Sequence, residues 1–197
     1  MMVGFGIRAH SGWASLVVVG KRDGGFVVVD RRRIELVEDE WAKQPYHAAE
    51  ALSPNAARDV VQRGVEAAHR IAVGEMRAAV KREREREHEV AGCAVLVANP
   101  MPDWTIEEIL AVHFRMHKAE GVLFRDALVR ATKACGLRLV AIPDKLLMEH
   151  AERVLGTPVS GLVKEIATLG KSVGPPWGKD QKDAALAALV ALQGRSK

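Results

Sequence analysis

Two pairs of residues in this chain have the spacing that metal binding or proton transfer requires. His113 and His117 lie one helical turn apart, so both could bind one metal ion. No Glu follows His113 as in the zinc-protease pattern, and His113 falls on an apolar helical stripe, which favours a histidine of the core. His47 and Glu50 are three residues apart, so on a helix they would share a face as a general base or as metal ligands. A polar loop before a helix is the alternative for this second pair.

Aspartates form the other group of candidates. Asp180 and Asp183 begin the last predicted helix and could together hold a hydrated Mg²⁺ or Mn²⁺ ion. The alternative is that Asp180 is an N-cap and that the helix dipole stabilises Asp183 in the first turn. Asp144 follows a predicted strand and is either a helix N-cap or part of a site at the carboxyl edge of a sheet, where open α/β sheets bind their ligands. His10, in the turn after the first strand, is expected near the same edge.

Length and composition limit the class of protein. The 197 residues, of which 48% are hydrophobic and 27% charged, are typical of a globular protein, and we expect one domain over residues 1–197. This balance excludes disordered, collagen-like and disulfide-scaffold proteins. Cys93 and Cys135 lie far apart in apolar segments, which favours free thiols in a reducing compartment. The chain shows no leader peptide and no apolar run of about 18 residues, so we expect a cytoplasmic protein without a membrane partner.

The net charge of +4 is unevenly distributed along the chain. Arg31, Arg32 and Arg33 form a basic cluster, and with Lys179 they are the candidate contacts to nucleic-acid phosphates. The alternative is an edge strand without a partner, because such strands carry Arg and Lys against aggregation. Aromatic residues make up only 5% of the chain, which disfavours a surface that stacks single-stranded bases.

The hydrophobic pattern predicts the elements that position these residues. Short apolar runs separated by Gly-containing turns predict three antiparallel strands, and two later runs, each after a helical segment, predict parallel strands. The strands are expected at residues 3–7, 13–19, 26–37, 92–98 and 137–142, and the helices at 54–86, 105–135, 144–155, 158–169 and 180–192. The result is an α/β fold with a mixed five-stranded sheet and helices on both faces, in the element order of the ribonuclease H-like fold. Gly121 is expected to kink the helix at 105–135.

The second half of the chain resembles the RuvC-type Holliday-junction resolvases, which have this fold. The last helix reads Asp180-Gln-Lys-Asp183-Ala-Ala-Leu-Ala, similar to an acidic D-x-x-D-A-L-A-type motif of that family. The segment Met116-His-Lys-Ala-Glu-Gly-Val122 is similar to a family helix with a glycine at that place. The resemblance implies phosphodiester hydrolysis with two Mg²⁺ ions about 4 Å apart, and it places Asp180 and Asp183 on the acids of the last helix.

The resemblance also implies an acid directly after Gly6-Ile7 and another near the end of the fourth strand. Arg8 stands at the first position, and Val-Ala-Asn occupies residues 97–99 at the second. A guanidinium keeps its proton in proteins, and at about 4 Å from a divalent ion it would cost several kcal/mol. We therefore expect a degenerate active site with an incomplete set of catalytic acids and no resolvase activity. In this site Arg8 would pair with Asp180 or Asp183 in place of a metal ion.

The leading hypothesis is thus a RuvC-like, non-catalytic protein that acts as a nucleic-acid-binding or assembly module and needs no cofactor. The first alternative is a nuclease or phosphohydrolase that depends on Mg²⁺ or Mn²⁺. It would use Asp180 and Asp183 together with His10, His47 or His113. The second alternative is a structural protein that associates with itself into a homo-oligomer.

Overall fold

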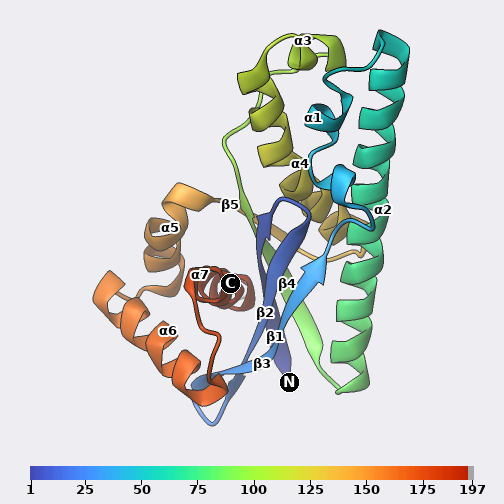
Figure 1. Ribbon diagram of the computed structural model, residues 1–197. Helices are drawn as coiled ribbons and strands as arrows, with labels where there is room; N and C mark the ends of the chain where they lie inside the picture. The colour runs from blue at the N-terminus through green and yellow to red at the C-terminus, as the bar shows by residue number, and fades with distance from the viewer. Residues whose placement is uncertain (195–197) are drawn as a thin grey trace.

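A computed structural model describes residues 1–194, and its centre is a five-stranded sheet (Figure 1). The strand order is β3-β2-β1-β4-β5; β1 pairs antiparallel with β2 and parallel with β4, β2 pairs antiparallel with β3, and β4 pairs parallel with β5. The strands are β1 (Met2–His10), β2 (Trp13–Arg22), β3 (Gly25–Glu35), β4 (Glu89–Val97) and β5 (Leu139–Pro143). The predicted fold class, a mixed sheet in the ribonuclease H-like order, is confirmed by this topology.

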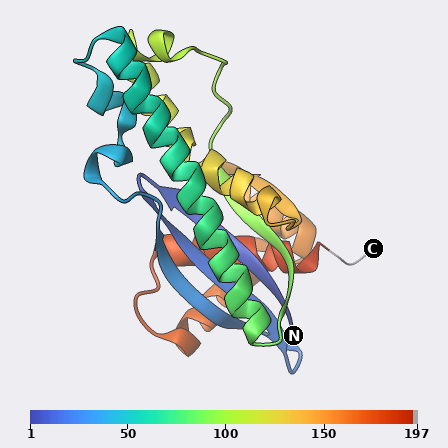
Figure 2. The ribbon, with the colours of Figure 1, turned by 90° about the vertical axis from the view of Figure 1, so that its right-hand side faces the viewer.

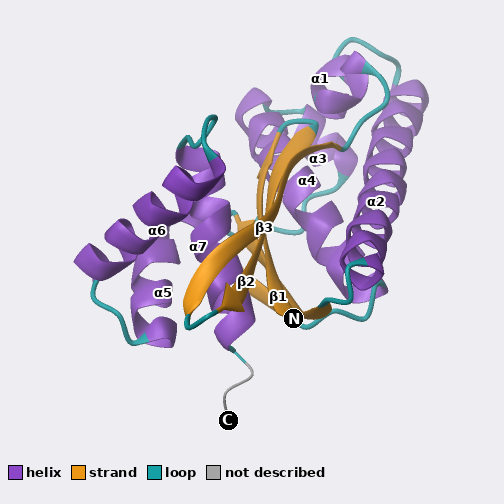
Figure 3. Ribbon diagram, turned by 90° about the horizontal axis from the view of Figure 1, so that it is seen from below, coloured by secondary structure: helices purple, strands orange, loops and turns teal. Residues whose placement is uncertain are grey.

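Helices cover both faces of the sheet, as predicted. In Figure 3, α2 and α4 lie on one side and α5, α6 and α7 on the other, and Figure 2 shows α2 crossing its face of the sheet obliquely. The helices are η1 (Glu40–Lys43), α1 (Pro45–Ala49), α2 (Pro54–Glu85), α3 (Ile106–Leu110), α4 (His113–Ala134), η2 (Asp144–Leu146), α5 (Leu147–Leu155), α6 (Val159–Val173) and α7 (Lys179–Gln193). Beyond the sheet, α1, α3 and the first turns of α4 gather beside the first half of α2 (Figure 1).

Side-chain alternation along β1 separates two apolar cores. Val3, Phe5 and Ile7 are fully buried in the core beneath α2 and α4. Gly4 and Gly6 face the opposite way, toward α7, because successive residues of a strand point to opposite sides of the sheet. The second core includes the alanines and leucines of α7, whose residues 184–191 are all buried.

The two glycines of β1 let α7 approach the sheet at backbone distance. A Cβ atom placed at Gly6 would overlap the carbonyl oxygen of Ala184, and one at Gly4 would overlap that of Ala188. Any side chain at these positions would push the helix away from the strand. Arg8 is the next residue on the same face of β1, so its side chain emerges at the point where α7 begins.

One helix prediction is wrong, because the segment forms two helices rather than one. The expected single helix at 105–135 with a kink at Gly121 is instead two helices, α3 and α4, and Gly121 lies inside α4. Thr105 and Glu108 form a capping box, which starts a short helix that buries Ile109. Val112 then adopts an extended conformation, with φ −141° and ψ 111°, and α4 starts after it. The break leaves His113 as the first residue of α4.

The segment around Tyr46, for which a helix and a polar loop were both considered, is the short helix α1. Pro45 occupies its first turn, where the missing N–H costs nothing. Tyr46 and Ala49 are buried against α2 and the start of α4, which holds the helix in place. Burial, together with the charge of Glu120, raises the pKa of Tyr46 above its ordinary value, so its phenol is neutral at physiological pH.

Both cysteines are free thiols. Cys93 is fully buried on β4, and burial raises its pKa to about 12. The half-buried Cys135 also has a raised pKa, chiefly through burial. Neither side chain is therefore an activated nucleophile.

None of the helices described over residues 1–194 is long and apolar enough to cross a membrane.

The contact between α7 and β1 can be tested with two glycine substitutions. Gly6→Ala should lower the free energy of unfolding by at least roughly 2 kcal/mol, because the added methyl overlaps helix backbone rather than a movable side chain. Gly74→Ala is the matched control: a Cβ there meets nothing within 4 Å on α2, so stability should rise by up to about 1 kcal/mol. Urea denaturation measures both values. Equal stability of the two variants would contradict the packing described here.

Candidate functional site

Arg8, at the carboxyl end of β1, is surrounded by three aspartates. Its Nη1 donates a hydrogen bond of 2.7 Å to Oδ2 of Asp183 and a longer one of 3.3 Å to Oδ1 of Asp144. Its Nε forms an ion pair with Oδ1 of Asp180 at 3.0 Å. The side chain of Arg8 is only 17% exposed, so these contacts are screened less than those of a surface ion pair. Arg8 contacts both aspartates with which we expected it to pair, and Asp144 as well.

The fold brings these acids together from two elements. Asp180 and Asp183 lie in the first turns of α7, which the glycines of β1 hold against the sheet. Asp144 is the first residue of η2, directly after β5, at the same carboxyl edge. Neither Asp180 nor Asp144 is the N-cap that we considered, because Gly178 precedes α7 and Pro143 precedes η2. The amide of Gly178 instead donates to Oε1 of Gln181 at 2.9 Å.

Two further cations complete the neutralisation of the aspartates. Arg125, on α4, donates from Nη2 to Oδ2 of Asp144 at 3.0 Å. Lys179 donates from Nζ to Oδ2 of Asp183 at 2.6 Å, one helical turn away on α7. With Arg8, three permanently charged cations therefore contact three carboxylates. We call these six residues the Arg8 network: Arg8, Arg125, Asp144, Lys179, Asp180 and Asp183.

His10 borders this network. Its Nε2 lies 3.0 Å from Oδ1 of Asp180, and its ring stacks on Trp13 with a centroid distance of 4.3 Å. A cavity of about 180 Å³ opens beside it, lined among others by Glu120 and Arg125. The end of β4, where the resemblance implied an acid, carries Val97, Ala98 and Asn99 and so contributes no carboxylate. Within residues 1–194, the acids that contact Arg8 therefore come from η2 and α7.

The structure separates His47, His113 and His117 from the acids of the Arg8 network and brings them close to one another. The ring centroids of His47 and His117 lie 4.6 Å apart, and Nε2 of His113 lies 3.1 Å from Nε2 of His117. The expectation that His113 is a core histidine is wrong, since its side chain is 63% exposed. The physical reason is the break at Val112, which makes His113 the first residue of α4 rather than a continuation of the apolar stripe.

The partner of His47 is Glu120 rather than Glu50. Oε2 of Glu120 lies 2.7 Å from Nδ1 of His47, and its Oε1 accepts the backbone N–H of His47 at 3.2 Å. Glu50 lies instead 3.8 Å from Nδ1 of His113. Sequence reasoning missed Glu120 because 73 residues separate it from His47. Its position three residues after His117, on the same helical face, was the signal that could have indicated it.

Each of the four candidate phosphate contacts has a partner within the chain. Arg31 binds the loop between α6 and α7, donating to the carbonyl oxygens of Gly174, Pro175 and Pro176. Arg32 pairs with Asp30, Arg33 pairs with Glu35 and covers the ring of Trp13 at 4.0 Å, and Lys179 pairs with Asp183. Three of the side chains remain accessible, with exposed fractions of 40% for Arg32, 53% for Arg33 and 74% for Lys179. Arg31 therefore serves the fold, whereas the other three still face solvent.

Comparisons with known proteins give distant similarities only. No protein-family model matches the chain, and neither does any curated protein. Among solved structures, the chain is similar to Thermus thermophilus RuvC, with 16% identity and a TM-score of 0.48. It is also similar to T. thermophilus RuvC in complex with a Holliday junction substrate, with 14% identity and a TM-score of 0.49. Both comparisons cover 96% of this chain and 92% of the other. At these levels of similarity, the chemistry of the site has to be inferred from this chain's own residues.

The Arg8 network predicts a specific pattern of stability changes. Arg8→Met should lower the free energy of unfolding by roughly 1–3 kcal/mol, because it leaves partly buried carboxylates without their cation. Arg8→Lys should recover part of this loss, since it keeps the charge without the guanidinium geometry. Lys179→Met is the control: its side chain is 74% exposed, so the change should stay within about 0.5 kcal/mol. Urea denaturation measures these changes. If Arg8→Met unfolds with the same free energy as the wild type, the network contributes nothing to stability.

Proposed function

We propose that this ribonuclease H-like chain is a nucleic-acid-binding module that does not hydrolyse phosphodiester bonds. The absence of hydrolysis is supported by the position of Arg8, whose guanidinium contacts Asp144, Asp180 and Asp183 together. Two-metal hydrolysis requires carboxylates with an unbalanced negative charge, which attract and clamp two divalent ions. Here each carboxylate already contacts at least one permanent cation.

A metal ion could enter this edge only if Arg8 moved away. The guanidinium cannot become neutral at any physiological pH, so it cannot yield its place by losing a proton. With Arg8 in place, an incoming divalent ion would meet a positive charge within a few ångströms, at a cost of several kcal/mol. In this arrangement the three aspartates form salt bridges with cations of the chain, and their role at the carboxyl edge of the sheet is structural.

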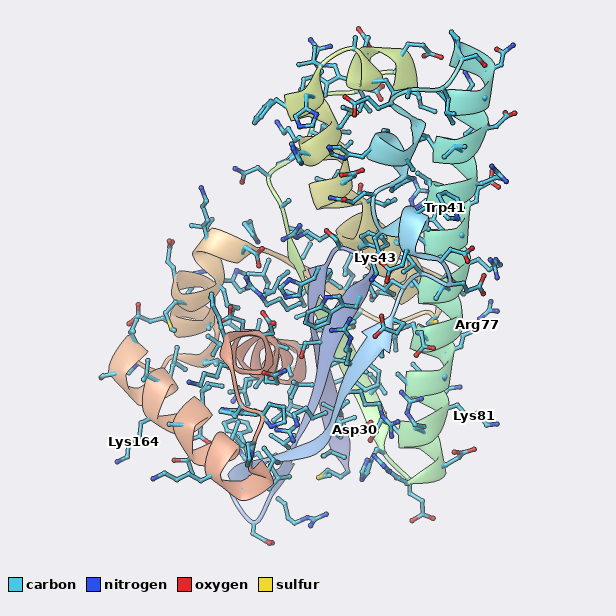
Figure 4. The ribbon with its side chains drawn as sticks, in the orientation of Figure 1. Asp30, Trp41, Lys43, Arg77, Lys81 and Lys164 are labelled. Atoms are coloured by element: carbon cyan, nitrogen blue, oxygen red, sulfur yellow. The ribbon has the colours of Figure 1, made fainter. Side chains whose placement is uncertain are left out.

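The nucleic-acid part of the proposal is supported by cations without partners on α2. Arg77, Lys81 and Arg84 line a cavity of about 660 Å³ between the second half of α2 and the end of α4. Within residues 1–194, the side chains of Arg77 and Arg84 take part in no hydrogen bond or ion pair, and the side chain of Lys81 reaches only Glu85, at 3.7 Å. Figure 4 shows Arg77 and Lys81 on the side of α2 that faces away from the sheet. Such cations are available to phosphate oxygens without breaking an existing contact.

The exposed cations Arg32, Arg33 and Lys179 are proposed as secondary phosphate contacts. Each would exchange a carboxylate two or four residues away for a phosphate oxygen. A surface ion pair is worth little, so this exchange is inexpensive. Self-association, the structural alternative, stays a prediction.

Binding can be measured by fluorescence anisotropy with a labelled duplex and a labelled four-way junction. The wild type should bind at about 50 mM salt and weaken as salt rises. The double variant Arg77→Ala/Arg84→Ala should bind several-fold more weakly, and its slope of log affinity against log salt should fall by about 1.8, since each phosphate contact contributes about 0.9. The control Lys164→Ala/Lys171→Ala removes the same charge from exposed positions on α6 and should bind like the wild type (Figure 4 labels Lys164).

A cleavage assay on the same substrates tests the other half of the proposal. With Mg²⁺ or Mn²⁺ added, both substrates should remain intact. Cleavage that depends on the divalent ion and disappears in Asp183→Asn would establish the enzyme alternative instead. Absence of any binding at about 50 mM salt would remove the nucleic-acid part, because phosphate contacts are strongest at low salt.

A further inference from the structure

Three imidazoles gather where α1 meets the start of α4, apart from the acids of the Arg8 network. One ring nitrogen from each of His47, His113 and His117 can be chosen so that all three lie within 4.8 Å of one another. We call these residues the histidine triad. The rings pack directly, with centroid distances of 5.1 Å between His47 and His113 and 4.6 Å between His113 and His117.

The fold supplies these rings from two anchored elements. His113 and His117 are four residues apart in the first turns of α4 and so project from one helical face. His47 lies on α1, which the buried side chains of Tyr46 and Ala49 fix against its neighbours. The backbone that carries the triad is therefore held by packing, whereas the rings of His113 and His117 are exposed.

Glu120 orients the ring of His47. Its side chain is only 4% exposed, and both of its oxygens contact His47, one at the ring Nδ1 and the other at the backbone N–H. A carboxylate at Nδ1 holds the proton there, so the lone pair of Nε2 is left to bind a ligand. Metal-binding histidines in proteins commonly have such a carboxylate behind them. The burial of the Glu120 carboxylate is explained if the ring of His47, which it contacts, binds a cation.

We propose that the histidine triad binds a Zn²⁺ ion through three imidazole nitrogens. Imidazole suits zinc and similar transition ions, whereas Mg²⁺ prefers oxygen ligands. The separation of 3.1 Å between Nε2 of His113 and Nε2 of His117 is close to the ~3.3 Å between neighbouring ligands of a tetrahedral zinc site. Since two of the rings are exposed, the fourth position faces solvent, and three protein ligands with one open position are typical of a zinc ion that binds a further ligand.

The proposed site is distinct from the acids implied by the resemblance to resolvases. It uses none of Asp144, Asp180 or Asp183. Glu120 nevertheless lines the cavity of about 180 Å³ that also contacts His10 and Arg125, so the zinc site and the Arg8 network lie on either side of one cavity. The inference does not depend on nucleic-acid binding, and its test is separate.

The test is a zinc titration of the untagged chain after removal of metals with a chelator. Competition with a chromophoric chelator gives the affinity, and Co²⁺ in place of Zn²⁺ should give the strong visible absorption of a tetrahedral site. The wild type should bind one ion per chain. His117→Ala should lower the affinity by roughly 100-fold or more, and Glu120→Gln by about 10–100-fold. His150→Ala, which removes another histidine from α5, is the control and should bind like the wild type.

Circular dichroism checks that each variant is folded. Because Glu120 is buried, its variant could fail to fold, and the exposed His117 then provides the decisive comparison. Failure of the wild type to bind one zinc ion would overturn the proposal. So would an affinity that is unchanged in His117→Ala, or one that falls equally in His150→Ala.

Discussion

The close approach of α7 to β1 determines which charged groups meet at the carboxyl edge of the sheet. Gly4 and Gly6 carry no side chain between strand and helix, so the backbones touch and the first turns of α7 lie over the end of the strand. Arg8, the next residue on that face, then meets Asp180 and Asp183. Strand alternation makes this meeting unavoidable, because a residue two positions after Gly6 must point to the same side. The salt-bridge network is thus a consequence of how the sheet is covered.

This geometry divides the polar chemistry of the molecule into two places. At the sheet edge, three carboxylates are balanced by three permanent cations, so the charge that would draw in divalent ions is already compensated. At the junction of α1 and α4, three imidazoles and a buried carboxylate form a separate cluster. The first arrangement favours a structural role, and the second favours a soft or borderline metal ion. Arg77, Lys81 and Arg84, which line the cavity between α2 and α4, form the third surface, which we propose for phosphate binding.

Much of the fold was predictable from the sequence, because hydrophobic period and turn residues are local signals. The mixed five-stranded sheet with helices on both faces followed from them. The pairing of Arg8 with an acid of the last helix came instead from the resemblance to the RuvC-type resolvases. The break at Val112 was not predictable, since the apolar stripe continues across it and only packing of α3 decides the phase. The contact of His47 with Glu120 joins two elements that are distant along the chain, and no local pattern encodes it. The histidine triad therefore emerged only in three dimensions.

The central claim is that Arg8 takes the place of a divalent ion among the acids, and Mn²⁺ binding followed by electron paramagnetic resonance tests it most directly. The measurement uses His117→Ala as the background, so that the histidine triad does not contribute. With Arg8 intact, no Mn²⁺ should bind at the acids. Arg8→Asp in the same background should bind Mn²⁺ at least roughly tenfold more tightly, because a positive charge is exchanged for a negative one. Mn²⁺ binding with Arg8 intact that is lost in Asp183→Asn would contradict the claim.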